Sequence, residues 1–220
     1  MSTKSTILFL PIFILAVPGC GKWPPVVNTK RDIERLPASQ RSIRARGLAD
    51  GDIPSLGRLR ELRTLDFSGG DAVKPAKITD EGLAELANLD LPDLETLTLG
   101  WCDEITDAGL AHIGRMQTIT WLGLTSCPKL TDSGLRELLN AKNLTGLDLR
   151  GCPNITDDGI QQLAAKKNWE CIELGGCPKV TPQGVAKLQA ALPNAPFVKK
   201  DDREWGFHAP HERSWRNDTR

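Results

Sequence analysis

Four cysteines recur along this chain at a constant spacing of 25 residues, each in a stretch rich in groups that could do chemistry. The stretch from Gly151 to Ile160 reads GCPNITDDGI and offers a thiol, an amide and two carboxylates. Such groups can bind a metal, and a thiolate can also act as a nucleophile. The four cysteines are Cys102, Cys127, Cys152 and Cys177. The first question is therefore whether the stretch is a site or a piece of scaffold.

The text around these cysteines recurs with them, which favours the scaffold. Copies begin at Leu94, Ile119, Leu144 and Trp169. A further copy begins at Leu62, with Gly70 in place of the cysteine and five extra residues before Ile78. A degenerate opening copy begins near Ile43, and APFVKK at 195–200 indicates a last strand. Because one repeat cannot bury its own apolar face, five or six copies must stack to form a core.

The pattern LxxLxLxxC followed by ITDxGLxxL resembles the cysteine-containing subtype of leucine-rich repeats, best known from F-box adaptor proteins. The resemblance covers residues 43–198. It implies an α/β fold, a leucine-rich repeat solenoid shaped as a curved horseshoe, with a parallel sheet on the concave side and helices on the convex side.

The two halves of each copy predict different elements. The LxLxx half predicts a short strand whose alternate leucines point inward. The second half predicts a helix that a threonine caps and that an aspartate begins, near the positive end of the helix dipole. Glycine weakens a helix, so the glycine that follows predicts a close approach to a neighbouring helix. The residues concerned are Thr106, Thr131 and Thr156, Asp107, Asp132 and Asp157, and Gly109, Gly134 and Gly159.

Three interpretations of the cysteine ladder compete. Buried thiols suit an inward turn, because free cysteine is among the most buried residue types. Stacked cysteines could meet disulfide distances, although parallel side chains point the wrong way for a bond. A metal needs four ligands around one point, and a linear ladder offers two neighbours. We expect structural thiols and no metal site.

The repeat register predicts which residues lie on the concave face of the sheet. Trp121 is expected there as an exposed aromatic, and tryptophan is enriched at binding hot spots. Beside it we expect a mixed-charge patch, or else solvated cross-strand pairs that contribute little. Cys171 is expected to be exposed, either reactive or an inert surface cysteine. The predicted binding residues are Trp121, Asp148, Arg150, Glu173, Thr96, Thr98 and Cys171.

The start of the chain predicts export. A lysine, an apolar run over residues 7–17 and small residues are typical of a signal peptide, here residues 1–19. The text from Val17 to Cys20 resembles the lipobox of bacterial lipoproteins, which implies cleavage before Cys20 and its lipidation. Residues 20–42 are then expected to be the anchor and a flexible tether. The charged tail over residues 199–220 is expected to be either a disordered end or a cap on the last repeat.

Composition and motifs limit the function. Basic and acidic residues balance at 28 each, so no net field recruits nucleic acid or a membrane surface. The sequence lacks the motifs HExxH and GxSxG, a Walker loop and the haem motif CxxCH, so we expect no catalysis and no cofactor. The sequence predicts a monomeric, exported, membrane-anchored module, periplasmic or on the cell surface, that binds a protein partner through its concave face. The alternatives are a substrate-recruiting adaptor of a ubiquitin ligase, which an export signal contradicts, and a cysteine-based redox or metal protein.

Overall fold

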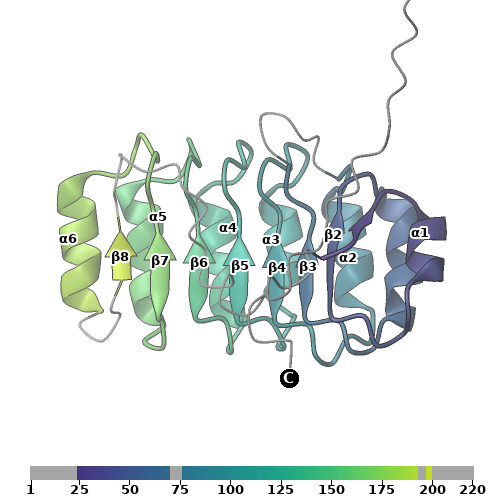
Figure 1. Ribbon diagram of the computed structural model, residues 1–220. Helices are drawn as coiled ribbons and strands as arrows, with labels where there is room; N and C mark the ends of the chain where they lie inside the picture. Colours follow the sequence, from purple (N-terminus) through teal and green to yellow (C-terminus); the bar gives the residue numbers. More distant parts are fainter. Residues whose placement is uncertain (1–23, 70–75, 193–196, 200–220) are drawn as a thin grey trace, which may run out of the picture. The chain divides into compact units, whose positions relative to one another are not determined.

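The structure, a computed structural model, describes residues 24–69, 76–192 and 197–199. Its strands form a single parallel sheet of eight strands in sequence order (Figure 1). The strands are β1 (Val26–Val27), β2 (Ser42–Ala45), β3 (Thr64–Asp66), β4 (Thr96–Thr98), β5 (Trp121–Gly123), β6 (Gly146–Asp148), β7 (Cys171–Glu173) and β8 (Phe197–Lys199). Each strand pairs in parallel with the next, so the fold is the predicted leucine-rich repeat solenoid.

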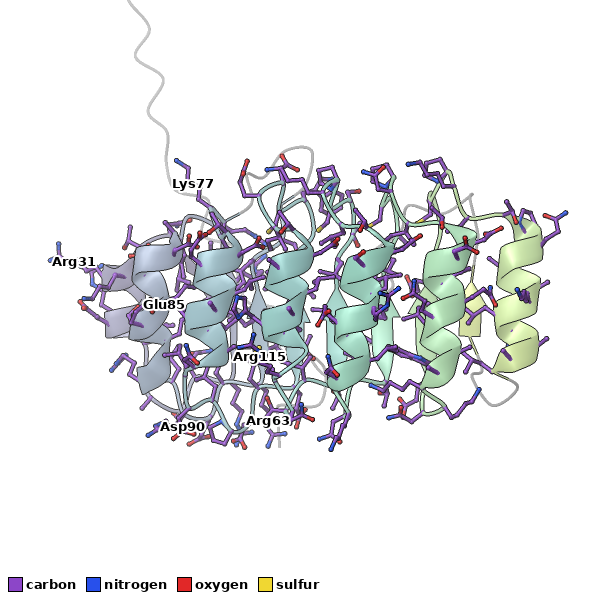
Figure 2. All side chains as sticks on the ribbon, turned by 180° about the vertical axis from the view of Figure 1, so that it is seen from behind. Arg31, Arg63, Lys77, Glu85, Asp90 and Arg115 are labelled. Atoms are coloured by element: carbon purple, nitrogen blue, oxygen red, sulfur yellow. The ribbon has the colours of Figure 1, made fainter. Side chains whose placement is uncertain are left out.

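The helices all lie on one side of this sheet, as Figure 2 shows from behind. They are α1 (Lys30–Arg35), α2 (Asp80–Ala87), α3 (Asp107–Ile113), α4 (Asp132–Glu137), α5 (Asp157–Gln162) and α6 (Pro182–Ala191), with 3-10 helices η1 (Asp50–Arg58), η2 (Leu138–Asn140) and η3 (Leu163–Ala165). The second repeat carries η1 in place of an α-helix. It contains Pro54, which has no amide hydrogen to donate to a helical hydrogen bond.

The core lies between the sheet and the helices. In β3 to β7 the middle residue of each strand points into the core, and successive middle residues pair across the sheet without a register shift. Leu65, Leu97, Leu122, Leu147 and Ile172 form this row, and each is fully buried. The first and third residues of these strands therefore point to the opposite side. We call that side the outer face; it is the predicted concave face.

The predicted threonine caps are present, and each also joins two repeats. The hydroxyl of Thr106 accepts a hydrogen bond from the backbone N–H of Ala108 at 3.2 Å and donates one to Asp80 Oδ2 at 2.6 Å. Asp80 is the first residue of the preceding helix, and its Oδ1 accepts the Thr106 backbone N–H at 2.9 Å. One hydroxyl thus satisfies an unpaired amide of its own helix and binds the carboxylate of its neighbour.

This hydrogen-bond ladder runs through five successive interfaces between repeats. The pairs are Asp50 with Thr79, Asp80 with Thr106, Asp107 with Thr131, Asp132 with Thr156, and Asp157 with Thr181. The distances from hydroxyl to Oδ2 are 2.5–2.7 Å throughout. For Asp107, Asp132 and Asp157 the sequence predicted only that they favour their own helix; the hydrogen bonds of the ladder to the next repeat were missed.

The helical glycines make room for this ladder. A Cβ atom built on Gly159 would overlap the carboxylate of Asp132, which binds Thr156 of the same helix start. Gly109 and Gly134 stand in the same relation to Asp80 and Asp107. The predicted close approach is therefore real, and what approaches is the carboxylate of the preceding repeat as well as its leucine side chain.

The turns before α3, α4, α5 and α6 each have one residue in the left-handed region, directly before the repeated cysteine. The φ values are 60° at Trp101, 55° at Ser126, 69° at Gly151 and 70° at Gly176. Glycine adopts this conformation without cost, whereas a residue with a Cβ does so at a cost of roughly 1 kcal/mol. The backbone therefore keeps one turn conformation even where the residue does not favour it.

The predicted flexible tether over residues 20–42 is wrong for its described part. Residues 24–42 contribute β1 and α1, where Val27 and Ile33 are buried. Thr29 and Asp32 form a reciprocal capping box at the start of α1. Residues 24–42 lack the repeat pattern because they have a neighbouring repeat on one side only, the repeat that begins with β2. An end repeat needs such a cap over its apolar edge, so the folded domain includes residues that precede the predicted start at residue 43.

At the other end, β8 supplies the last strand that APFVKK predicted. The predicted signal peptide, Cys20 and the tail beyond Lys199 lie outside the described residues. Among the described residues, no helix is long and apolar enough to cross a membrane.

Candidate functional site

The outer face brings the predicted binding residues together on four adjacent strands. Thr96 and Thr98 belong to β4, and Trp121 is the first residue of β5. Asp148 ends β6, with Arg150 two residues beyond it, and β7 supplies Cys171 and Glu173. The residues at the first position of successive strands form one row: Thr64, Thr96, Trp121, Gly146 and Cys171. The predicted register is therefore the observed one.

Trp121 is not the exposed aromatic that the sequence predicted: only 8% of it is accessible. Its indole lies against Gly146 of the neighbouring strand, where a Cβ atom would overlap the ring, 2.5 Å from Cζ3. Strands are about 4.8 Å apart, so a ring can lie flat over the next strand only where that strand has no side chain. The signal for this packing in the sequence was Gly146, which occupies in the next repeat the position that Trp121 occupies in its own.

Cys171 was also predicted to be exposed, and it too is only 8% accessible. Cys171 on β7 pairs with Gly146 on β6, and Trp121 lies on β5, the other neighbour of β6. A position on the outer face is therefore not by itself evidence of an accessible thiol.

The charged residues of the predicted patch form a compact cluster. Arg150 donates to both carboxylate oxygens of Asp148, from Nε at 3.0 Å and from Nη2 at 2.7 Å. Its Nε also lies 3.0 Å from Glu173 Oε2 on the next strand. Thr125 donates its hydroxyl to Asp148 Oδ2 at 2.9 Å. This arrangement joins three strands and differs from the solvated pairs that were the alternative prediction.

Burial sets the energetics of this cluster. Asp148 is 4% accessible, and the side chains of Arg150 and Glu173 are 20% and 14% accessible. The hydrogen bonds to Asp148 raise the pKa of Arg150 above its ordinary value, against the effect of burial. A partly buried pair of this kind is strongly destabilised when one partner is removed, because the other charge loses its compensation.

A second cluster on the same face escaped the sequence analysis. Arg46 follows β2 and binds Asp66 of β3, with Nη2 2.7 Å from Oδ2 and Nη1 3.2 Å from Oδ1. Asp66 Oδ1 also accepts the hydroxyl of Thr98 at 2.7 Å and the backbone N–H of Ser68 at 2.9 Å. Arg46 belongs to the degenerate opening copy, which the repeat pattern aligned only near Ile43.

The two arginines occupy the same place in their repeats. Arg44 on β2 pairs with Asp66 on β3, as Asp148 on β6 pairs with Glu173 on β7. Arg46 and Arg150 each lie two residues after the first member of these pairs. Each binds the acid of the following repeat, Asp66 or Glu173. Aligning the opening copy residue by residue would have revealed the second cluster.

The cysteine ladder lies on the other side of the backbone, inside the core. Cys102, Cys127, Cys152 and Cys177 are all buried. The thiols of the last three donate to a backbone carbonyl of the preceding repeat. The distances from Sγ to oxygen are 3.3 Å to Leu99, 3.1 Å to Leu124 and 3.0 Å to Leu149.

Reactivity of these thiols is suppressed. Burial raises the pKa of Cys102 from 9.0 to about 12, and burial likewise raises the pKa of Cys127 and Cys152. The cysteines of the described part are free thiols, and no cluster of three or more metal-binding side chains occurs there. A buried thiol with a raised pKa is a poor nucleophile and a poor metal ligand.

Comparison with known proteins identifies the repeat. A family profile described as Leucine Rich repeat matches residues 91–114 and 140–164. Each segment covers one strand and the helix that follows it, β4 with α3 and β6 with α5, in agreement with the observed fold. No match was found among curated protein sequences.

Solved structures of three proteins align with the chain. The yeast Rad7 and Elc1 complex aligns at 23% identity and a TM-score of 0.46, over 63% of this chain and 42% of the matched chain. The TLR13–ssRNA13 complex aligns at 21% and 0.49, over 70% and 22%. An internalin, inlF of Listeria monocytogenes, aligns at 20% and 0.47, over 70% and 40%. This chain thus spans less than half of each matched chain.

Proposed function

We propose that this leucine-rich repeat protein is a non-enzymatic binding module that recognises a protein partner through the outer face of its sheet. One observation carries the proposal. The inward row is leucine or isoleucine in every repeat from β3 to β7, whereas the outer row changes from threonine to tryptophan, glycine and cysteine. An invariant outer row would suit stacking alone; a varied row makes a surface with distinct chemistry at each strand.

The burial on this face narrows which residues would contact a partner. Asp148 is almost inaccessible and positions Arg150, so recognition falls to Arg150, Glu173 and the Thr98 hydroxyl, which are partly accessible. Trp121, which is 8% accessible, would support this surface by covering Gly146. Aromatic and arginine side chains at the centre of a surface dominate many protein interfaces.

The test is capture of partners from an extract of the native host. Glu173→Lys is expected to abolish capture of proteins that the unchanged chain retains. Glu85→Lys is the matched control, because it makes the same charge change on α2, on the helix side of the sheet (Figure 2). Loss of capture with Glu85→Lys but not with Glu173→Lys would place the interface on the helices and overturn the proposal.

We further propose export and anchoring through Cys20, on the strength of the apolar run and the lipobox-like text before it. Acyl chains on Cys20 would hold the protein at a membrane, and more than one chain is needed for stable anchoring. Cys20→Ser is then expected to release the protein into the soluble fraction of cells. Unchanged fractionation would refute the anchor and leave the outer-face proposal intact.

A further inference from the structure

Charge is unevenly distributed along the described chain. Residues 24–69 hold nine basic and six acidic residues, a net charge of +3. Residues 76–192 hold ten basic and sixteen acidic residues, a net charge of −6. The overall balance of the chain therefore conceals a basic first part and an acidic remainder, and fields of opposite sign act at different places along the solenoid.

Several basic side chains of the first part are occupied within the fold. Arg58 holds the end of α1, where its Nη1 donates to the carbonyl oxygens of Ile33 at 2.8 Å and Leu36 at 2.6 Å. Arg46 binds Asp66, and Arg60 forms an ion pair with Asp90. These arginines are structural and do not form the surface that matters here.

Arg41 and Arg63 are exposed as well, but helix α1 gathers three exposed basic side chains within six residues. Lys30, Arg31 and Arg35 are all exposed, whereas Ile33 is buried and α1 packs on η1. Figure 2 shows Arg31 at the extreme end of the row of helices, pointing away from them. We call Lys30, Arg31 and Arg35 the basic end.

The two acids of α1 do not cancel this charge fully. Asp32 accepts the backbone N–H groups of Asn28 and Thr29, and these hydrogen bonds lower its pKa, so it remains an anion committed to the cap. Glu34 lies 3.9 Å from Lys30, at the limit of an ion pair between exposed side chains. Such pairs contribute little and leave the surface open to other anions.

We propose that the basic end binds the anionic surface of a lipid membrane. Charge complementarity favours an anionic partner, and the position in the chain favours lipid over nucleic acid. Cys20 precedes Pro24, the first described residue, by four positions, which an extended chain spans in about 14 Å. Basic residues next to a membrane anchor add electrostatic binding to it. The preference for lipid over nucleic acid rests on the proposed export; the preference for an anionic partner does not.

The acidic remainder would then set the orientation of the protein. A net charge of −6 over residues 76–192 is repelled by an anionic surface, whereas α1 at the opposite end is attracted. The solenoid would stand on α1 with later strands farther from the lipid. The outer face over β4 to β7 would thereby remain open to a partner while the first repeat contacts the membrane.

The experiment measures cosedimentation of the full chain with vesicles. Vesicles of phosphatidylglycerol and phosphatidylcholine are compared with vesicles of phosphatidylcholine alone. The apolar run over residues 7–17 contributes equally for every variant, so differences between variants report on α1. We expect binding to the anionic vesicles to exceed binding to the neutral ones and to weaken as salt screens the charges.

The decisive variant replaces Lys30, Arg31 and Arg35 together by Gln. Each basic residue near an anionic surface contributes about a fivefold gain in affinity, so the triple variant should bind about a hundredfold more weakly. The variant Arg31→Lys/Arg35→Lys keeps the charges and should bind as the unchanged chain does. Thermal unfolding of each variant verifies that α1 still folds, because Gln is a good helix former.

The matched control replaces Lys142, Lys167 and Lys187 by Gln, which removes the same charge from exposed positions on later repeats. This control should bind anionic vesicles undiminished. An equal loss in the control, or no loss in the Gln variant of α1, would overturn the proposal. Binding of the basic end to a single-stranded polynucleotide without binding to vesicles would overturn it as well. These results do not depend on partner capture, so either proposal can fail alone.

Discussion

The strand-to-helix turns and the outer face lie a few residues apart in each repeat, yet their sequences vary in opposite ways. The turns repeat the same threonine, aspartate, glycine and cysteine because each residue bonds to the repeat before or after it. The outer face also joins successive repeats, but each junction there uses a different pair of side chains, as Trp121 lies against Gly146 and Arg150 binds Glu173. Repetition marks the junctions that the repeats share, and variation marks where a partner can be distinguished.

The largest expected effect tests the buried thiols of the turns. Cys102, Cys127 and Cys152 have pKa values raised by burial above the ordinary 9.0, so they keep their protons at a pH where the unfolded chain loses them. Their stabilisation is complete below pH 9 and is lost as the pH rises from there toward 12. At pH 10 the loss should be about 1.4 kcal/mol per thiol, or roughly 4 kcal/mol for three.

Urea unfolding at pH 8 and pH 10 measures this loss. In Cys152→Ala, whose turn has one thiol fewer, the difference between the two pH values should shrink by about 1.4 kcal/mol. Alkylation of the native protein by iodoacetamide at pH 10 should be slow. Rapid native labelling of these cysteines would show that they ionise without unfolding and that the core does not protect them.

The second prediction breaks the junction between two repeats. In Gly159→Ala the new methyl group overlaps the carboxylate of Asp132, which must then release Thr156. Overpacking together with the lost hydrogen bonds should cost about 3 kcal/mol, whereas alanine ordinarily stabilises a helix relative to glycine. The change in the free energy of unfolding in urea measures this cost.

Gly51→Ala is the matched control, because a Cβ atom there has no neighbouring atom within 4 Å. It should leave the stability of the chain almost unchanged. Stabilisation by Gly159→Ala would mean that the ladder of aspartate and threonine contributes less than helix propensity, and that the turns repeat for another reason.

On the outer face we expect a smaller cost. Asp148→Ala removes one of the two carboxylates that bind the Arg150 guanidinium; the ion pair with Glu173 is retained. Complete burial of an unpaired charge costs about 3–5 kcal/mol, but the Arg150 side chain is partly accessible and retains an acid, so roughly 2 kcal/mol is expected. Calorimetric unfolding tests this, and the double variant Asp148→Ala/Arg150→Ala should recover part of the loss. No recovery would show that the two residues act independently.

The smallest effect concerns the left-handed residue before each cysteine. Ser126→Gly places glycine at a φ of 55° and should stabilise the protein by up to about 1 kcal/mol, reduced by the greater freedom of glycine in the unfolded chain. Gly151→Ala, at the equivalent position with a φ of 69°, should destabilise by a similar amount. Melting temperatures of the two variants that move in the same direction would contradict the shared turn conformation.

Much of this fold follows from the spacing of residues alone. The 25-residue period, the alternation of leucines and the position of Thr106 before Asp107 are sufficient for strands, register and helix starts, because stacked repeats share one geometry. The cap formed by residues 24–36 could not be recognised in this way. It occurs once, and its burial depends on the neighbour that it covers.

The repeat pattern does not determine which side chains of the outer face are accessible; the tertiary structure decided this. The sequence placed Trp121, Cys171 and the charges of β6 and β7 on one face, because alternate residues of a strand share a side. Their accessibility depended on the adjacent strand: Gly146 lets the Trp121 ring lie flat, and Asp148 holds Arg150 in place. Local chemistry thus set the direction of each side chain, and contacts between repeats set what each side chain can still bind.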